Sequence, residues 1–158
     1  MYRLSYLPQF IAESLTKTKR ENMQTEKNII ETKINLISNK EWLINNFDLV
    51  HKDCTKVAEM TAQNLLNDFK SKYPNDENGE PAYCGFAWVV VYDVKLNTKL
   101  GKAMKACGFK KNYGGGISLW NPSNYHGQSM DIKEEGASAY ANLLSTYGFK
   151  AYMSSRPD

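Results

Sequence analysis

A polar segment from residue 120 to residue 131 carries side chains suited to ligand binding. It combines aromatic rings that stack, amides and hydroxyls that form hydrogen bonds, and one histidine. Near the C-terminus, Arg156 adds a guanidinium of the kind that pairs with a carboxylate or phosphate. The candidate ligand-binding residues are Trp120, Asn121, Asn124, Tyr125, His126, Gln128, Ser129 and Arg156. These residue types predict a site for a small polar or anionic ligand, or for a partner protein.

His126 is the one candidate catalytic residue in this segment. A triad of Ser129, His126 and Asp93 lacks the sharp turn that exposes a nucleophilic serine. The other interpretation of the segment is structural, because asparagine, proline, serine and glycine are common turn formers. We therefore predict a binding protein, and we keep a small enzyme that uses His126 as a second alternative.

The lysines of the chain are unevenly distributed. The net charge is +3, yet residues 94–130 contain six lysines and no acidic residue, so they alone carry +6. A Lys-rich segment at 95–111 favours an alternative function, nucleic-acid binding through phosphate contacts. The candidate contacts are Lys99, Lys102, Lys105, Lys110, Lys111 and Tyr113. The other interpretation is a solvated lysine face without a ligand.

The composition is typical of a soluble globular protein. Of the 158 residues, 42% are hydrophobic and 23% are charged, which excludes intrinsic disorder and a disulfide-stapled miniature. Three cysteines without CxxC spacing predict reduced thiols and a cytoplasmic location. No apolar run approaches the roughly 18 residues of a membrane span, so we expect no membrane partner.

Metal and cofactor sites are not indicated. The two histidines, His51 and His126, lack metal-ligand spacing. The glycine run at 114–116 precedes a predicted strand, whereas phosphate-binding loops follow a strand and open a helix. We therefore predict no metal and no cofactor.

The chain divides into an extension and one domain. Residues 1–22 combine aromatic residues, Pro8 and a basic cluster, and they predict an N-terminal extension or arm. Residues 23–158 predict a single domain. Within it we expect a helical region at 23–72, a loop at 73–82 and a βαβαβ unit at 83–158.

Three apolar segments predict strands, at Cys84–Asp93, Ile117–Trp120 and Lys150–Ser155. The helices between them have about 12–15 residues, enough to return the chain for a parallel strand. The first strand is apolar on both faces, which is typical of a central strand. The sequence therefore predicts an α/β (or α+β) fold with a small three-stranded parallel sheet of order 2-1-3, crossover helices and a preceding helical region.

Such a sheet would bring the candidate ligand-binding residues to one edge. The C-terminal ends of parallel strands meet there, so we expect Tyr92, Trp120 and Arg156 to lie close together. Asp131 and Glu134 have capping-box spacing and predict the start of the last helix, whose free N–H groups attract anions. The end of the Lys-rich segment is expected at the opposite edge.

Several short segments resemble a group of short, functionally unassigned tailed-phage proteins. They are GFAWV at 85–89, GISLWNPS at 116–123, HGQSMD at 126–131 and SRPD at 155–158. The resemblance covers about residues 84–158, and it implies a phage or prophage protein that acts in the cytoplasm of a bacterial host. Together with the residues above, it predicts a phage-encoded accessory protein that holds a host partner or small ligand through residues 120–131 and Arg156.

Overall fold

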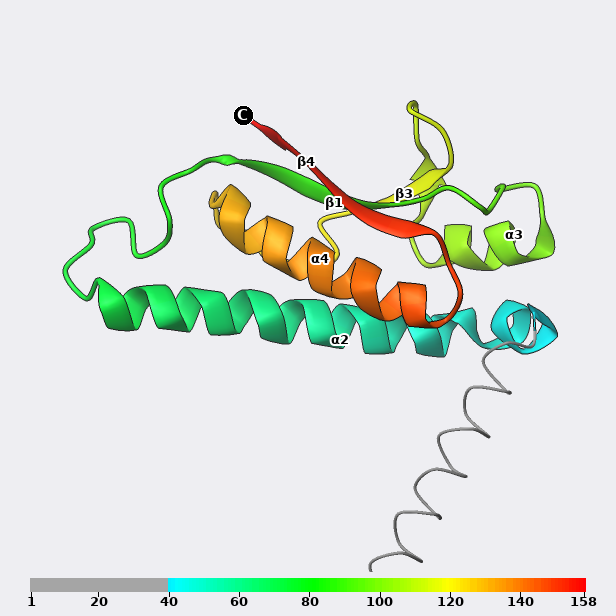
Figure 1. Cartoon of the computed structure of the whole chain (residues 1–158), viewed down its shortest axis with the longest axis horizontal. Helices are drawn as coiled ribbons and strands as arrows, with labels where there is room; N and C mark the ends of the chain where they lie inside the picture. Colours follow the sequence, from blue (N-terminus) through cyan, green and yellow to red (C-terminus); the bar gives the residue numbers. More distant parts are fainter. Residues whose placement is uncertain (1–39) are drawn as a thin grey trace, which may run out of the picture. The chain divides into compact units, whose positions relative to one another are not determined.

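A computed structural model describes residues 40–158 (Figure 1). The elements are α2 (Lys40–Lys72), β1 (Gly85–Val91), α3 (Lys99–Ala106), β2 (Lys110–Lys111), β3 (Ile117–Trp120), α4 (Met130–Thr146) and β4 (Ala151–Pro157). The predicted arm at 1–22 and the start of the predicted helical region lie outside the described residues.

The four strands form one sheet in the order β2-β3-β1-β4, and every pair in it is antiparallel. β1 lies between β3 and β4, and its Trp88 faces Trp120 on one side and Ser154 on the other. α3 connects β1 to β2, and α4 connects β3 to β4. This β-α-β-β-α-β connectivity is the split βαβ arrangement.

The predicted three-stranded parallel sheet of order 2-1-3 is wrong, because the sheet is antiparallel and the fold is α+β. α3 does return the chain as expected, but it leads into the short strand β2 and not directly into β3. The chain then reverses in a hairpin, so β3 runs antiparallel to β1. β4 follows another helical crossover, and it therefore also runs antiparallel to β1.

A glycine-rich turn makes this reversal. The Asn112 side chain donates a hydrogen bond of 2.9 Å to the carbonyl of Gly115, and the Asn112 backbone N–H donates to Gly116. Gly115 and Gly116 have φ angles of 102° and 71°, in the region that favours glycine. The glycine run is therefore the turn of a hairpin between β2 and β3.

Replacing Gly116 by alanine is expected to destabilise the hairpin. A Cβ at this position would lie 2.3 Å from the carbonyl oxygen of Val91, and the φ of 71° adds backbone strain. We expect Gly116→Ala to lower the free energy of unfolding by about 1–3 kcal/mol in urea denaturation. Gly114→Ala is the matched control, because its Cβ would meet no atom closer than 3.4 Å. Equal stability of the two variants would contradict this account of the turn.

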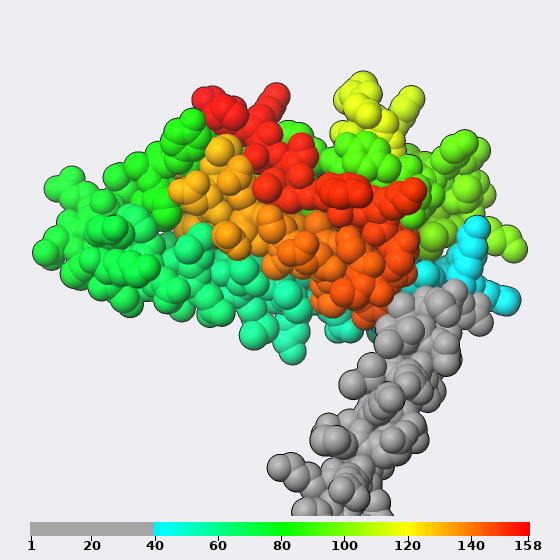
Figure 2. Space-filling view, in the orientation of Figure 1, coloured from blue at the N-terminus to red at the C-terminus, as the bar shows by residue number. Residues whose placement is uncertain are grey.

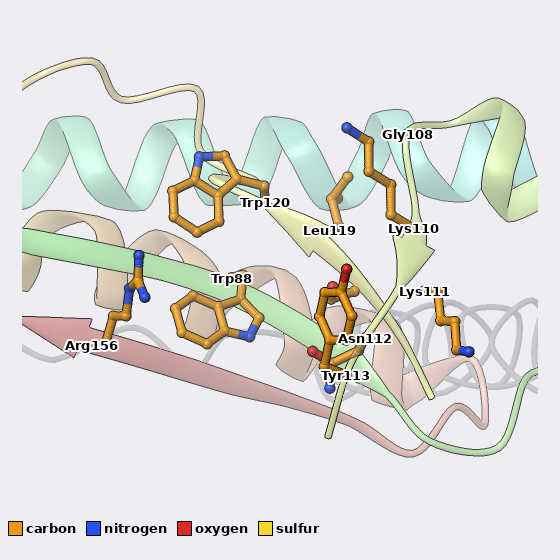
Figure 3. A pocket seen from close by; sticks show the side chains of 10 residues that line it. Trp88, Gly108, Lys110, Lys111, Asn112, Tyr113, Leu119, Trp120 and Arg156 are labelled. Carbon is orange, nitrogen blue, oxygen red and sulfur yellow. The ribbon is translucent and has the colours of Figure 1, made fainter. Parts of the chain in front are cut away.

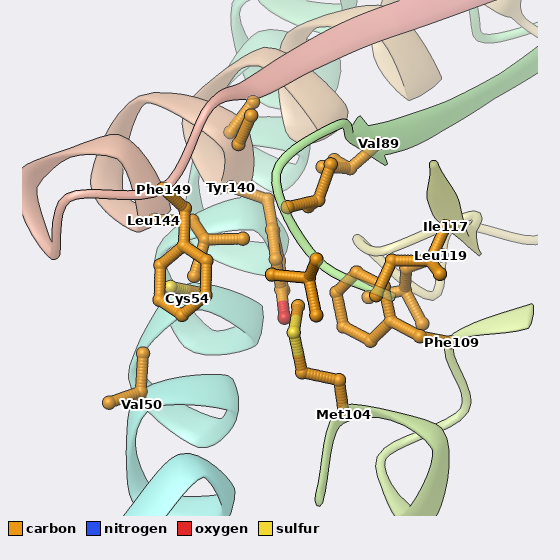
Figure 4. Close-up of a cluster of buried hydrophobic side chains, with 14 of the residues drawn as sticks. Val50, Cys54, Val89, Met104, Phe109, Ile117, Leu119, Tyr140, Leu144 and Phe149 are labelled. Atoms are coloured by element: carbon orange, nitrogen blue, oxygen red, sulfur yellow. The ribbon is translucent and has the colours of Figure 1, made fainter. Parts of the chain in front are cut away.

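Helices cover one face of the sheet. α4 packs against β1 and β4, and α2 packs against α4 and α3 (Figure 1). In the core, the Phe47 ring meets Phe109 and Phe149 edge-on, with centroids 5.9 and 5.8 Å apart. Met104 and Tyr140 fill the space beside them and are fully buried (Figure 4). The core therefore lies between the helices and a single face of the sheet.

The two crossover helices, α3 and α4, begin differently. The Thr98 hydroxyl caps α3 by accepting a hydrogen bond of 3.0 Å from the N–H of Gly101. Ser129 precedes α4, but its side chain makes no capping hydrogen bond. Asp131 lies inside the first turn, and Glu134 accepts a hydrogen bond from a serine of β4. The predicted capping box of Asp131 and Glu134 is therefore wrong.

A histidine of α2 meets a buried hydroxyl of α4. Nδ1 of His51 lies 2.7 Å from the hydroxyl of Tyr140, which is fully buried. Burial lowers the pKa of His51, because the protonated ring loses solvation. Burial also raises the pKa of Tyr140, and it raises the pKa of nearby Cys54 to about 12 with a further contribution from Asp53. The described core thus favours uncharged forms of all three side chains.

The lowered pKa of His51 predicts a loss of stability in weak acid. The unfolded chain takes up a proton on this histidine near pH 6.5, whereas the folded chain takes it up only at lower pH. The free energy of unfolding should therefore fall between about pH 7 and about pH 5. Urea denaturation across this range should show a weaker fall for His51→Gln than for the wild type. His126→Gln changes the chain's other histidine at an exposed position, and an equal effect of this control would contradict the prediction.

Candidate functional site

The sheet face opposite the helices carries aromatic side chains. Neighbouring side chains on a strand point to opposite faces, so Ala87 and Val89 enter the core while Phe86 and Trp88 lie on the open face. The rings of Trp88 and Trp120 stack with centroids 5.8 Å apart and planes 11° apart. Trp120 is nevertheless 56% exposed. An exposed aromatic cluster of this kind is typical of a binding surface.

A groove of about 770 Å³ borders the two tryptophans. Figure 3 shows Tyr113 and Lys111 at the end of the groove formed by the β2–β3 hairpin, with Arg156 at the opposite end. The lining residues are Trp88, Gly108, Lys110, Lys111, Asn112, Tyr113, Ser118, Leu119, Trp120 and Arg156. We call this space the tryptophan groove.

The tryptophan groove is positively charged. Lys110, Lys111 and Arg156 line it, and no acidic side chain does. Among residues 40–158, none of these three cations forms an ion pair. The Arg156 guanidinium lies 5.5 Å from the centre of the Phe86 ring, and the Lys133 amine lies 5.4 Å from the same ring. These are cation–π distances, so the ring contacts Arg156 at the groove and Lys133 at the neighbouring small pocket of about 170 Å³.

The expected single edge of strand ends does not exist, because the sheet is antiparallel. Tyr92 follows the C-terminal end of β1, whereas Trp120 pairs with Trp88 and Arg156 pairs with Phe86 nearer the start of β1. Trp120 and Arg156 nevertheless come together, since β3 and β4 run in the same direction on either side of β1. The structure also brings the end of the Lys-rich segment to these two residues, where the sequence predicted opposite edges.

Most of the predicted ligand-binding side chains in the loop after β3 contact other parts of the protein. The Asn121 side chain donates to the carbonyl of Tyr125, and the Asn124 side chain donates to Glu59 of α2. Both asparagines have positive φ, at 42° and 50°, a conformation that asparagine tolerates better than most residues. These two side chains therefore shape the loop before any ligand binds.

Glu80 fixes the far end of the same loop. One carboxylate oxygen accepts a hydrogen bond from the hydroxyl of Tyr125, and the other accepts one of 2.9 Å from the backbone N–H of Gln128. The amide oxygen of Gln128 lies 3.6 Å from the thiol of Cys84. Tyr125 and Gln128 are thus held by protein partners.

His126 and Ser129 differ in exposure. His126 borders a small pocket of about 170 Å³ together with Trp120 and Lys133, and its side chain forms no hydrogen bond with a described residue. Ser129 is 1% exposed, and its hydroxyl has no hydrogen-bond partner within the described part of the chain. The structure therefore gives His126 neither a nucleophile nor a carboxylate partner among residues 40–158.

Sequence reasoning missed Phe86 and Trp88 as functional candidates. It treated β1 as apolar on both faces and therefore as covered on both faces. Side-chain size was the signal in the sequence. From Phe86 to Val89, β1 alternates an aromatic residue with alanine or valine, so the large rings all lie on one face. The α3 members of the predicted nucleic-acid set do not line the tryptophan groove, and these are Lys99, Lys102 and Lys105.

Comparisons of the chain with protein-family models, with curated proteins and with solved structures found no match. The resemblance to phage proteins therefore stays a prediction from the sequence. Among residues 40–158, no helix is long and apolar enough to cross a membrane. In the same part of the chain, no three histidine, cysteine, aspartate or glutamate side chains are arranged to hold a metal ion.

Replacing Glu80 by alanine is expected to loosen the loop at 121–128. The change removes both hydrogen bonds of the carboxylate, and hydrogen bonds to a charged group contribute about 1.5–3 kcal/mol each. Hydrogen exchange at Tyr125 and Gln128 should accelerate, while exchange in β1 should stay the same. Glu77→Ala alters an exposed acid in the same connection as a control. Unchanged exchange at Gln128 would show that Glu80 does not anchor the loop.

Proposed function

We propose that the tryptophan groove binds single-stranded nucleic acid. The observation that carries this proposal is the pair of stacked tryptophans on an open sheet face, beside three cations that form no ion pair with a described residue. Proteins that bind single strands combine the same two features, a basic path for the phosphates and aromatic rings on which bases stack. The proposal joins Trp120 and Arg156 to Lys110, Lys111 and Tyr113.

A single strand suits this surface better than a duplex. Trp120 offers its ring from a sheet face, and a base can stack on it only when that base is free of its own neighbours. In a duplex the faces of the bases are covered by adjacent base pairs, and proteins read their edges by placing a helix or a β-ribbon in a groove. The cations at both ends of the tryptophan groove support a strand that crosses the tryptophans.

A phage origin and a location in the bacterial cytoplasm, both predicted from the sequence, are compatible with this proposal. We propose, on the sequence resemblance alone, that the chain is a phage accessory protein in the bacterial cytoplasm, where single-stranded RNA and DNA are available. A host partner or small ligand at residues 120–131 is the alternative, and it would use His126 and the pocket of about 170 Å³. The internal hydrogen bonds of that loop leave fewer side chains for such a ligand.

Removing the exposed indole is expected to weaken binding. Stacking of one base on an aromatic ring contributes about 1–3 kcal/mol, so Trp120→Leu should weaken affinity by about 5-fold to 150-fold. Fluorescence anisotropy with labelled RNA and DNA oligomers of about 12 nucleotides measures this change. Trp120→Phe should restore part of the affinity, and a duplex of the same sequence should bind more weakly. Equal affinity of Trp120→Leu and wild type would refute a role for the ring.

The three cations predict a measurable salt dependence. Each phosphate contact with a single strand contributes about −0.7 to the slope of log affinity against log salt, so three contacts predict about −2. The double variant Lys110→Ala/Lys111→Ala should reduce the slope by about 1.4. Lys99→Ala/Lys105→Ala removes the same charge from α3 and should leave the slope nearly unchanged. An equal effect of this control would favour the whole Lys-rich segment over the groove.

A second copy of the chain is the competing occupant of an aromatic sheet face. Light scattering coupled to size-exclusion chromatography measures the molecular mass and distinguishes a second copy from nucleic acid. If nucleic acid is the occupant, wild type and Trp120→Leu should have the same mass when no nucleic acid is present. A wild-type dimer that dissociates in the Trp120→Leu variant, together with no affinity for either oligomer, would overturn the proposal.

A further inference from the structure

A second exposed aromatic pair lies on the same face of the sheet as the tryptophans. Tyr92 follows β1 and Tyr152 belongs to β4, and their ring centroids are 6.0 Å apart. The two rings are 53% and 58% exposed. Tyr152 is the partner of Val90, which shares a face with Trp88, so strand alternation places it on the open side. The open face therefore carries two aromatic pairs at different positions along β1.

The separation of the pairs matches a short oligonucleotide. Tyr152 is level with Val90, two positions along β1 from Trp88. Tyr92 lies four positions from Trp88, which is about 13 Å at about 3.3 Å per strand residue. Bases in a stacked strand are about 3.4 Å apart, so this span holds about four nucleotides, and fewer when the strand is extended. The span is about 20 Å when it is measured from Phe86, and it then holds about six nucleotides.

The surface between the two pairs is formed by short side chains, and Lys110 of β2 lies beside them as the register partner of Ser118. Val90 is almost completely buried there, and its neighbour on β3 is Ser118. Ser154 of β4 lies beside Trp88. The hydroxyls of Ser118 and Ser154 are able to donate hydrogen bonds to a strand that passes over this part of the sheet.

Positive charge continues toward the second pair. A hollow of about 580 Å³ beside Tyr92 is lined by Lys95 and Lys111, and no acidic residue lines it. Lys111 lines both this hollow and the tryptophan groove. Asp93 is next to Tyr92 in the chain, but one of its carboxylate oxygens accepts a hydrogen bond of 3.2 Å from the backbone N–H of Lys150. This positively charged hollow borders Tyr92, so lysines lie beside one ring of the second pair.

We propose that Tyr92 and Tyr152 form a second stacking position for the same strand. This inference rests on the proposed function, and it narrows the ligand to an oligonucleotide of at least about four nucleotides. A mononucleotide or the last base of a strand would occupy the tryptophan groove alone. The competing explanation is a cross-strand tyrosine pair that only stabilises the sheet, and it predicts a change in stability without any change in the preferred ligand length.

A length series separates these explanations. Labelled oligouridine and oligothymidine of about 2 to about 12 nucleotides are titrated with the full chain. Wild-type affinity should rise with length and level off near about six nucleotides. Tyr152→Leu should bind the shortest oligomers within about twofold of wild type and the longer ones about fivefold or more weakly. Trp120→Leu should bind weakly at every length.

Matched variants control for folding and for general loss of aromatic surface. Tyr83→Leu removes a tyrosine that is 59% exposed but precedes the sheet, and it should reproduce the wild-type length series. Tyr152→Phe keeps the ring and should also reproduce it. Thermal unfolding by circular dichroism identifies any variant that is unfolded at the assay temperature, and Tyr92→Leu then serves in place of such a Tyr152 variant.

The outcomes distinguish this inference from the proposed function. If Tyr152→Leu and Tyr92→Leu are folded and keep the wild-type length series while Trp120→Leu loses affinity, the second position is refuted and the groove proposal stands. If no oligomer of any length binds the wild-type chain, both fail. A wild-type affinity that is already maximal at about two nucleotides refutes the second position as well.

Discussion

The hydrogen bond from the Asn112 side chain to the carbonyl of Gly115 closes the turn through which β3 returns beside β1. The direction of β3 follows from that turn, and the direction of β4 follows from β3 because α4 makes one further crossover. The same reversal places Trp120 opposite Trp88 and brings the lysines of β2 beside them. The position of Trp120 and of the β2 lysines in the tryptophan groove therefore depends on a turn of five residues, 112–116.

Side-chain size divides β1 into two chemically different faces. Small and branched side chains, among them Ala87 and Val89, allow α4 to approach the sheet closely. Aromatic side chains on the other face have no covering element among the described residues, and Trp120 keeps more than half of its surface exposed. Exposed aromatic area is costly in water, so a contiguous cluster of it is typical of a surface that becomes covered by a ligand.

The chemistry of this surface is the basis for the proposed choice of ligand. Aromatic rings stack on any base, because every base has a flat face. Cations without carboxylate partners attract phosphate. A protein partner would meet the same rings, but it would not require a groove lined by Lys110, Lys111 and Arg156 without any acidic residue. The loop after β3 contributes shape more than contacts, since Glu80 and Glu59 already bind its polar groups.

The sequence by itself determined the approximate positions of α3, α4 and the three longer strands, because apolar periodicity is local. It did not determine the start of α4, where the expected capping box is absent, or the length of α3, which has 8 residues. It did not determine strand direction. β2 consists of two exposed lysines and has no apolar pattern, so the hairpin that reverses β3 was invisible. Only the tertiary structure decided that Arg156 and Lys110 border one groove, since antiparallel pairing joins residues far apart in the chain. It also decided that one face of β1 stays open, which depends on where the helices pack.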